Sequence, residues 1–402
     1  MKKIFLMVWC LVVISELIWA QEYKIEPDKV ITRKNYEKYL PELKRLFLPG
    51  PFSIVSNGLK NGWITVPVVE KRKYPLPKGF IKATRENTGK LKVGKDNQII
   101  GDWKGGVPFP HPKTGAELGW NAYRRRECGE DFYMLNTCLL FDKKFRQERS
   151  FTNYFFKKSF VGRTDFPPIP EIPGNNGLVA WKESMLVIKP YDIKGFSMIR
   201  THYEDIYRDD DVFSYIPAIR RIRRLTGSDV TDPMLGSDTC YDDFEGWHQK
   251  INSRMSFKML GTKKFLTPRS YTKKPPEPYI KTNCYQVEWE IRPLCILEIQ
   301  MNDPGYAYKK RILYLDKEEG SYPIAYGETY DLKGRFWRSN YTMVVRYYDP
   351  ESRQKNYWGC YYADHISGHT TPCPMQPVSL NLGEVSVGKE EFTITGLIKK
   401  AR

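Results

Sequence analysis

The sequence of 402 residues has little that would indicate a membrane anchor or a known catalytic motif. After residue 20, no apolar run approaches the ~20 residues that a helix needs to cross a bilayer. No G-x-S-x-G elbow, P-loop, CxxC or CxxCH motif occurs, so the hydrolase, NTPase, thioredoxin-like and c-type haem classes receive no support. We therefore expect a protein that is not an enzyme and uses no cofactor.

Metal-binding patterns are equally scarce. Of the five histidines, His365 and His369 lie four apart, but the segment lacks the glutamate of an HExxH zinc motif. The acid-rich segment 236–246 offers many carboxylate oxygens without the ordered ligand spacing of an EF-hand loop. We expect no metal site.

The N-terminus has the features of a secretory signal peptide. Lys2 and Lys3 precede an apolar run over residues 4–14, and the small residue Ala20 comes just before a polar segment. The run is too short to anchor the chain in a membrane. We expect residues 1–20 to be removed and the protein to be exported.

Acidic residues are fewer than basic residues. Lys and Arg number 64 against 47 for Asp and Glu, a formal net charge of +17. Such a surplus favours acidic partners, either an anionic membrane surface, lipid head groups or nucleic acid. Export makes nucleic acid the least expected of the three.

Cysteine is present at eight positions, of which Cys10 would leave with the signal peptide. An oxidising compartment makes three local disulfides plausible, with Cys240 left over. The candidate pairs are Cys128 with Cys138, Cys284 with Cys295, and Cys360 with Cys373. Spacing does not fix this connectivity.

The hydrophobic pattern predicts a mainly β protein. Residues 35–47 form a helical pattern with Pro41 inside it. From about residue 180 the pattern has period two, and in residues 285–292 Tyr, Val, Trp and Ile alternate with Gln, Glu, Glu and Arg. Further strand-like runs lie between residues 185 and 363. Strands this close, without helical segments between them, indicate an antiparallel meander that forms a large curved sheet or open barrel.

Three regions follow from this pattern: a signal peptide (1–20), an N-terminal extension packed on the main domain (21–100), and a single half-barrel domain (101–402). Residues 164–177, rich in proline and glycine, resemble a linker.

The stretch GGVPFPHPKTGAELGWN, residues 105–121, joins a stiff loop to a helix. The prolines from Pro108 to Pro112 exclude a central strand, and Thr114 with Glu117 has the spacing of a capping box. The helix would present Trp120 and Tyr123. If it closes a ligand cavity, Trp120 should be partly exposed in the empty protein; the alternative is a rigid corner without ligand contact.

The basic run at residues 220–224 could bind an anion. On a strand, Arg221 and Arg223 share one face, and two guanidinium groups can hold a phosphate or carboxylate. The alternative is pairing of these arginines with nearby carboxylates, of which the candidates are Asp209, Asp210, Asp211, Asp242 and Asp243.

Aromatic residues make up 14% of the chain and recur on strand faces. Trp289, Tyr314 and Trp337 would be ordinary core in a closed sandwich. In a half-open curved sheet the same side chains would line an apolar cavity.

Six ordered motifs resemble a known family. They are residues 105–121, YIPAIRRIRRL (215–225), DPMLGSD with DDFEG (232–246), KRILYLDKE (310–318), YDLKGRFWR (330–338) and FTITGLIKKAR (392–402). Together they resemble the bacterial domain of unknown function family 1329, which is grouped with LolA/LolB-like, outer-membrane lipoprotein-sorting proteins. The resemblance implies an incomplete antiparallel barrel closed by helices over an apolar cavity, and a periplasmic location in a Gram-negative bacterium.

The resemblance also implies partners: an inner-membrane transporter of the resistance-nodulation-division type and an outer-membrane β-barrel protein. No enzymatic activity comes with it. Our hypothesis is a periplasmic carrier or chaperone for a hydrophobic, anionic lipid-like ligand, with a part in outer-membrane biogenesis. A structural adaptor that carries nothing, and a hydrolase of lipid or glycan, remain as alternatives.

The signal peptide gives a direct prediction. N-terminal sequencing of the protein from its host should find a chain that begins near Gln21, because export cleaves a leader of this design. Membrane-bound protein that retains residues 1–20 would contradict it.

Overall fold

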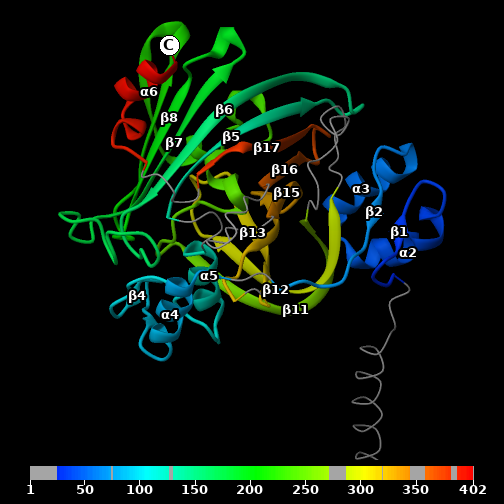
Figure 1. The fold of residues 1–402 in the computed structure, drawn as a ribbon, viewed down its shortest axis with the longest axis horizontal. Helices are drawn as coiled ribbons and strands as arrows, with labels where there is room; N and C mark the ends of the chain where they lie inside the picture. The colour runs from blue at the N-terminus through cyan, green and yellow to red at the C-terminus, as the bar shows by residue number, and fades with distance from the viewer. Residues whose placement is uncertain are drawn as a thin grey trace, which may run out of the picture.

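A computed structural model describes residues 25–73, 76–125, 130–270, 287–318, 320–344, 358–381 and 387–401. The predicted signal peptide, Cys128 and Cys284 lie outside these residues. The described chain is mainly β, with one large antiparallel sheet that is not closed and a few short helices beside it (Figure 1). The predicted fold class is therefore confirmed. Among the helices of the described residues, none is long and apolar enough to pass through a bilayer.

The sheet has 13 strands. Their bounds are β5 Asp131–Phe141, β6 Gln147–Ser159, β7 Val179–Lys189, β8 Ser197–Tyr203, β9 Asp211–Ile216, β10 Arg221–Leu225, β11 Met255–Ser270, β12 Glu288–Met301, β13 Tyr308–Asp316, β14 Ile324–Asp331, β15 Phe336–Val344, β16 Trp358–Asp364 and β17 Thr370–Asn381. In space the order is β10-β9-β8-β7-β6-β5-β17-β16-β15-β14-β13-β12-β11.

Two antiparallel meanders make up this order. Strands β5 to β10 follow one another in both chain and sheet, as do β11 to β17, and the two runs join where β5 pairs with β17. The end strands β10 and β11 each pair with one neighbour within the described sheet, so the curved sheet remains open (Figure 1). The predicted meander is confirmed.

Four strands were missed by the sequence pattern: β5, β6, β14 and β17. The first six residues of β14 are all buried, and a strand covered on both faces lacks the alternation on which the prediction depends. Strand β17 contains Pro372 and Pro374, residues that disfavour a central strand.

Strand β12 does not have the one buried and one exposed face that the alternating pattern predicts. Val287 and Trp289 are buried as predicted, but Glu290 and Arg292 are also buried. Arg292 Nη1 lies 2.8 Å from Glu290 Oε2, and Arg292 also pairs with Asp316. The charged side chains therefore face a second buried layer in which they satisfy one another.

Five helices lie beside the sheet in the described chain, together with two small two-stranded sheets. The helices are α2 Tyr36–Leu46, α3 Pro49–Asn61, α4 Lys78–Asn87, α5 Gly115–Tyr123 and α6 Ile394–Ala401. The small sheets pair β1 Val30–Ile31 with β2 Val66–Pro67, and β3 Lys92–Val93 with β4 Ile99–Ile100. Short 3₁₀ turns are η1 Tyr191–Ile193, η2 Pro217–Ile219 and η7 Glu390–Phe392.

The proline and the capping box that the sequence predicts are both found in the helices. Helix α2 contains Pro41, as expected, and a proline at the first position of α3 begins the next helix at once. Helix α5 begins with the predicted capping box: Thr114 Oγ1 accepts from the Glu117 backbone N–H at 3.2 Å, and the Glu117 carboxylate accepts from the Thr114 N–H at 3.2 Å.

The N-terminal segments pack on the sheet in two places (Figure 1). Residues of α2 and α3 share an apolar cluster with Trp289 and Tyr326 of the sheet. Residues of α4, the β3–β4 pair and α5 share a second cluster with Leu297 and Leu313. The boundary expected near residue 100 thus lies inside the second cluster.

The proline loop and α5 form a packed corner. The Asn121 side chain bonds both the N–H and the carbonyl of Phe109, at 2.9 and 2.7 Å, and Tyr322 Oη donates to the Pro110 carbonyl at 3.1 Å. Trp120 is 3% exposed, and its indole N–H donates to the Asn97 carbonyl at 2.6 Å. A lid would leave Trp120 partly exposed in the empty protein, so its burial agrees with the alternative of a rigid corner, in which the helix faces the second apolar cluster.

This burial predicts a stability effect. Trp120→Ala should lower the free energy of unfolding by about 3–5 kcal/mol, because it leaves a cavity in a packed core. The matched control is Trp63→Ala, since Trp63 is 38% exposed. Denaturant unfolding of both variants is the measurement. Equal losses would show that Trp120 is not core.

Candidate functional site

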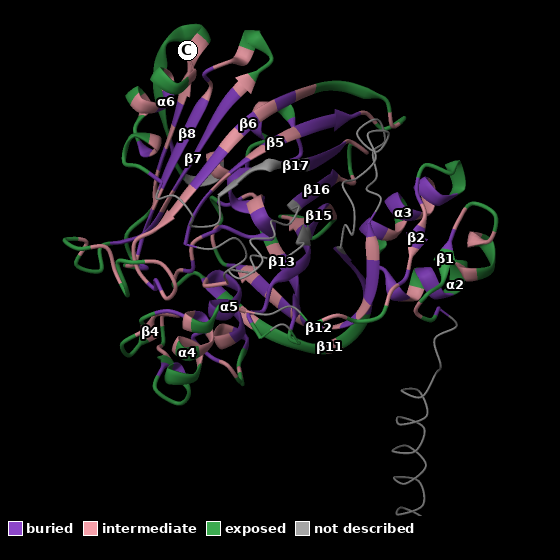
Figure 2. Ribbon diagram, in the orientation of Figure 1, coloured by how far each residue is buried: buried purple, intermediate pink, exposed green. Residues whose placement is uncertain are grey.

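The concave side of the sheet is filled by the segment that joins β10 to β11. We call residues 226–254 the inner loop; it contains η3 Gly227–Thr231, η4 Met234–Gly236 and η5 Tyr241–Gly246. Most of its residues from 237 to 249 are buried, although η5 is the only helical element among them. Figure 2 shows buried residues along the strands and inside the curve, with exposed residues at the outer turns.

Two consecutive aspartates fix the inner loop to distant strands. Asp242 Oδ1 accepts from Arg200 of β8 at 2.8 Å, and Asp243 Oδ1 accepts from Arg311 of β13 at 2.6 Å. All four side chains are buried. Because β8 is the third strand of the sheet and β13 the eleventh, this pair of contacts spans the open side of the curve.

Further hydrogen bonds complete this charged centre. Tyr306 donates to Asp242 at 2.7 Å, and Tyr308 donates to Asp243 at 2.6 Å. Burial alone would raise the pKa of Asp243, but Arg311 and Arg338 outweigh burial and hold that pKa below its usual range. Asp243 is therefore a carboxylate in the folded protein.

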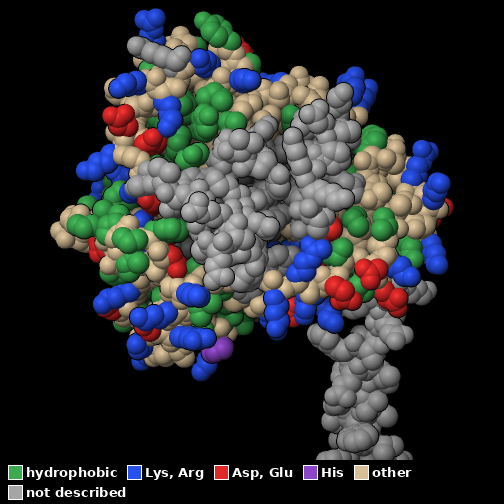
Figure 3. Space-filling view, viewed as in Figure 1, with side chains coloured by type: hydrophobic (Ala, Val, Ile, Leu, Met, Phe, Trp, Pro, Cys, Tyr) green, Lys and Arg blue, Asp and Glu red, His purple; other side chains and the backbone are tan. Residues whose placement is uncertain are grey.

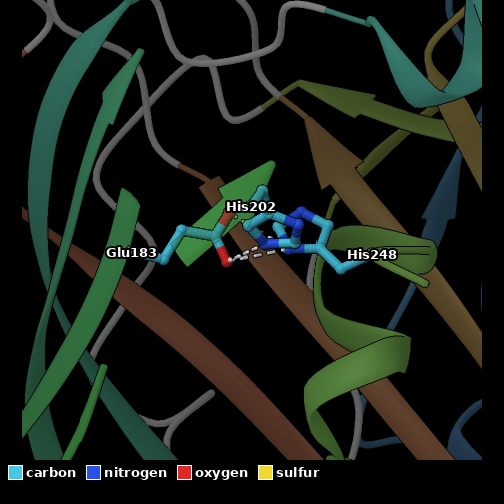
Figure 4. Close-up of side chains that lie close together, drawn as sticks. All are labelled: Glu183, His202 and His248. Atoms are coloured by element: carbon cyan, nitrogen blue, oxygen red, sulfur yellow. Dashed lines mark hydrogen bonds and ion pairs between the residues drawn. The ribbon is translucent and has the colours of Figure 1, made fainter. Parts of the chain in front are cut away.

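A second buried cluster lies beside the first. Glu183 of β7, His202 of β8 and His248 of the inner loop point toward one another (Figure 4). Glu183 Oε2 lies 3.4 Å from His202 Nε2 and 3.2 Å from His248 Nδ1. Burial opposes the ionisation of Glu183, but His248 and His202 overcome this and hold its pKa well below the usual range.

An apolar cavity of about 20 Å³ lies between the inner loop and strands of the sheet. Its wall is adaptable, with methionine and aromatic side chains from both sides. Those residues include Phe151, Phe155, Met185, Met198, Met234 and Phe244. Glu183 and Arg200 also border it, so the charged centre closes one end of the apolar space.

A larger polar cleft, of about 350 Å³, lies on the other side of Arg200. Its lining includes four cations, Arg200, Arg224, Lys250 and Arg254, and four carboxylates, Asp209, Asp210, Asp242 and Asp303. The cleft is thus balanced in charge. In the view of Figure 3, the Lys and Arg side chains of the described residues are scattered, with Asp and Glu side chains between them.

The seven side chains predicted to bind ligand lie in separate parts of the fold. Trp120 and Tyr123 belong to the second apolar cluster, against which the partly buried Trp337 packs, while Trp289 and Tyr314 belong to the cluster under α2 and α3. Arg221 and Arg223 are exposed on the edge strand β10. The structure does not bring these residues together.

The basic run is mostly a solvated edge. Arg223 pairs with Asp229 at 2.9 Å, and Arg224 pairs with Asp211 at 2.7 Å. Asp211 is among the partners expected from the sequence, but Asp242 and Asp243 instead bind arginines of β8 and β13. Charged side chains on an exposed edge also discourage pairing with another sheet.

Five cysteines lie in the described chain, and no disulfide joins any two of them: Cys138, Cys240, Cys295, Cys360 and Cys373. Cys360 and Cys373 are opposite one another on β16 and β17, as a local pair requires. The predicted disulfide between them is nevertheless not formed, because Cys373 Sγ turns to Cys138 Sγ on β5, 3.0 Å away. The other two predicted pairs each include a cysteine outside the described residues.

A contact between a serine hydroxyl and a histidine ring in the described chain bears on the hydrolase alternative. Ser339 Oγ lies 2.8 Å from His365 Nε2. A Cβ atom at Gly50 would come within 2.6 Å of that oxygen and 2.8 Å of that nitrogen, so the start of α3 already fills the space. The pair offers a substrate no room.

Sequence reasoning missed Glu183, His202 and His248. These residues are far apart in the chain, and no short spacing signals them. Strand β7 pairs with β8 so that Trp181 faces His202 and Glu183 faces Arg200, which brings the glutamate beside the histidine. The path of the inner loop then adds His248. A reliable prediction of the register between β7 and β8 would have placed Glu183 close to His202.

The chain is similar to a family of proteins and to one protein of Pseudomonas aeruginosa. The model of a family described as protein of unknown function (DUF1329) matches residues 30–379. An uncharacterised protein of Pseudomonas aeruginosa is 22% identical over 342 residues, which cover 81% of this chain and 71% of that protein.

Two solved structures match most of the chain. A putative outer membrane lipoprotein-sorting protein domain from Vibrio parahaemolyticus has a TM-score of 0.50 at 18% identity, covering 71% of this chain and 98% of that one. A DUF1329 family protein from Desulfovibrio piger has a TM-score of 0.47 at 14% identity, covering 70% and 95%.

The buried aspartates predict a large stability effect. Asp243→Asn should lower the free energy of unfolding by about 3–5 kcal/mol, because Arg311 is left as an uncompensated buried charge. The control is Asp102→Asn, which removes the exposed Asp102–Lys104 pair and should cost about 0–1 kcal/mol. Urea unfolding compares them, and a small loss for Asp243→Asn would contradict the buried pairing.

Proposed function

The chain belongs to the DUF1329 family, and we propose that it is a periplasmic carrier or chaperone that binds a hydrophobic, anionic lipid-like ligand. The open curved sheet, shared with a putative lipoprotein-sorting domain, supports a carrier fold. In this proposal the protein binds its ligand and does not transform it.

One observation carries the proposal: an apolar cavity and a polar cleft meet at Arg200. A lipid-like ligand has an apolar chain and a polar head, and the two spaces offer each part a matching surface. The surplus of cations in the chain favours an anionic head group or an anionic membrane surface.

Binding requires the inner loop to move. Sites for drug-sized ligands occupy about 300–1,000 Å³, far more than the apolar cavity of about 20 Å³. Methionine side chains can repack as a ligand enters, and three of them line this cavity. The ion pairs of Asp242 and Asp243 oppose the movement, so we assign this closed arrangement to the empty carrier.

The proposal extends to location and partners. The leader-like N-terminus supports export to the periplasm, and the resemblance to the family supports work with a resistance-nodulation-division type transporter and an outer-membrane β-barrel protein. A ligand released between these two partners would serve outer-membrane biogenesis.

The first test is the content of the protein as its host makes it. Mass spectrometry of protein purified without detergent should find co-extracted lipid. Protein that carries no lipid and binds no lipid probe would contradict the carrier and favour the structural adaptor.

The second test blocks the apolar cavity. Met198 is 5% exposed and lines the cavity, so Met198→Trp should weaken binding of a fluorescent polyunsaturated fatty acid by about tenfold or more. The matched control is Met259→Trp at a site 37% exposed on β11, which should bind as the wild type does. Equal binding by both folded variants would exclude this cavity as the site.

A further inference from the structure

We infer that Glu183, His202 and His248 form a binding site for one divalent transition metal ion of the Zn²⁺ class. The inference goes beyond the proposed carrier function and does not depend on it. Two imidazoles and one carboxylate are a ligand set that catalytic zinc sites use, with further positions left for water. No pattern in the sequence predicted such a site.

The positions of the three ligand atoms fit a metal ion. Glu183 Oε2 lies 3.4 Å from His202 Nε2 and 3.2 Å from His248 Nδ1, and all three ligand atoms lie within 4.8 Å of one another. Bonds of about 2.0–2.1 Å in a tetrahedron place ligand atoms about 3.3 Å apart. The cluster therefore needs little rearrangement to hold zinc (Figure 4).

Carboxylates lie beside both imidazoles. His248 Nε2 lies at hydrogen-bond distance, 2.8 Å, from Glu245 Oε2. In metal sites, a ligating histidine commonly donates its other ring N–H to a carboxylate in this way. Asp210 Oδ2 lies 2.8 Å from His202 Nδ1 as an ion-pair neighbour without hydrogen-bond geometry, and all five side chains are buried.

The ligating carboxylate is held as well. Glu183 Oε1 accepts from the Trp181 indole N–H at 2.8 Å, and Lys157 Nζ lies 3.5 Å from the same oxygen. Oε2 lies near both histidines, and Oε1 also lies 3.2 Å from His248 Nδ1. Trp181 and Lys157 therefore hold the carboxylate beside both imidazoles.

The three ligands come from two parts of the fold. Because His248 belongs to the inner loop and the other two ligands belong to β7 and β8, a bound ion would hold the inner loop on the sheet.

The experiment measures metal uptake by the mature, untagged protein. Protein stripped with a chelator and then equilibrated with Zn²⁺ should retain one zinc per chain by elemental analysis, and its melting temperature should rise with zinc. Co²⁺ in place of Zn²⁺ should give the visible absorption of a four-coordinate site. A stripped wild type that takes up neither metal overturns the inference.

Variants assign the uptake to this cluster. His248→Gln removes a ligand and should weaken zinc binding by more than about 100-fold. Asp210→Asn keeps all three ligands but alters a neighbour of His202 that also pairs with Arg200, and should weaken binding by about 10–100-fold. The matched control is His369→Gln. His369 also lies between two carboxylates, Asp238 at 2.7 Å and Glu148 at 3.1 Å, and its replacement should leave uptake unchanged.

The outcomes separate this inference from the carrier function. Zinc lost from His369→Gln but kept by His248→Gln would place the metal elsewhere and contradict the assignment. If ligand variants fold poorly, the zinc stoichiometry and the cobalt spectrum of the wild type still decide the matter. None of these measurements uses lipid, so failure of the carrier proposal would not alter them.

Discussion

The inner arrangement of the protein depends on two neighbouring carboxylates, Asp242 and Asp243, that bind arginines on opposite arms of one open sheet. Arg200 and Arg311 come from strands far apart in the sheet order, and each pair is buried. Isolated charges could not remain there, because burial without a partner costs several kcal/mol per ion. The curve of the sheet, the path of the inner loop and the cavities beside it must therefore form together.

This constraint changes the usual picture of a half-barrel carrier. A carrier cavity is expected to be apolar and open to its ligand, whereas here a segment rich in carboxylates fills the concave side. The apolar space that remains is small and lined by methionine and phenylalanine. Under the proposed carrier function, ligand entry would be a competition between burial of the ligand's apolar surface, which favours opening, and the buried ion pairs that the loop must break. A metal ion on His248 would shift that balance toward the closed state.

The sequence predicted the fold better than the interior. Period-two runs and the Thr114 capping box depend on neighbouring residues, so they survive as signals without tertiary information. Strand β14 and the buried Glu290–Arg292 pair could not be predicted from such local signals. Both faces of the sheet are covered there, so residues that an alternating pattern would place in solvent are buried. The cluster of Glu183 with the two histidines arises from register and loop path, neither of which leaves a local pattern.

The central claim is that the inner loop is a movable cover over the ligand space. Amide hydrogen exchange of residues 226–254, with and without a saturating fatty-acid probe, tests it most directly. The account predicts faster exchange in the inner loop when the probe is bound, with β5 to β8 unchanged or more protected. Unchanged exchange in the loop at full probe occupancy would show that ligand binds without displacing it, and would contradict the account.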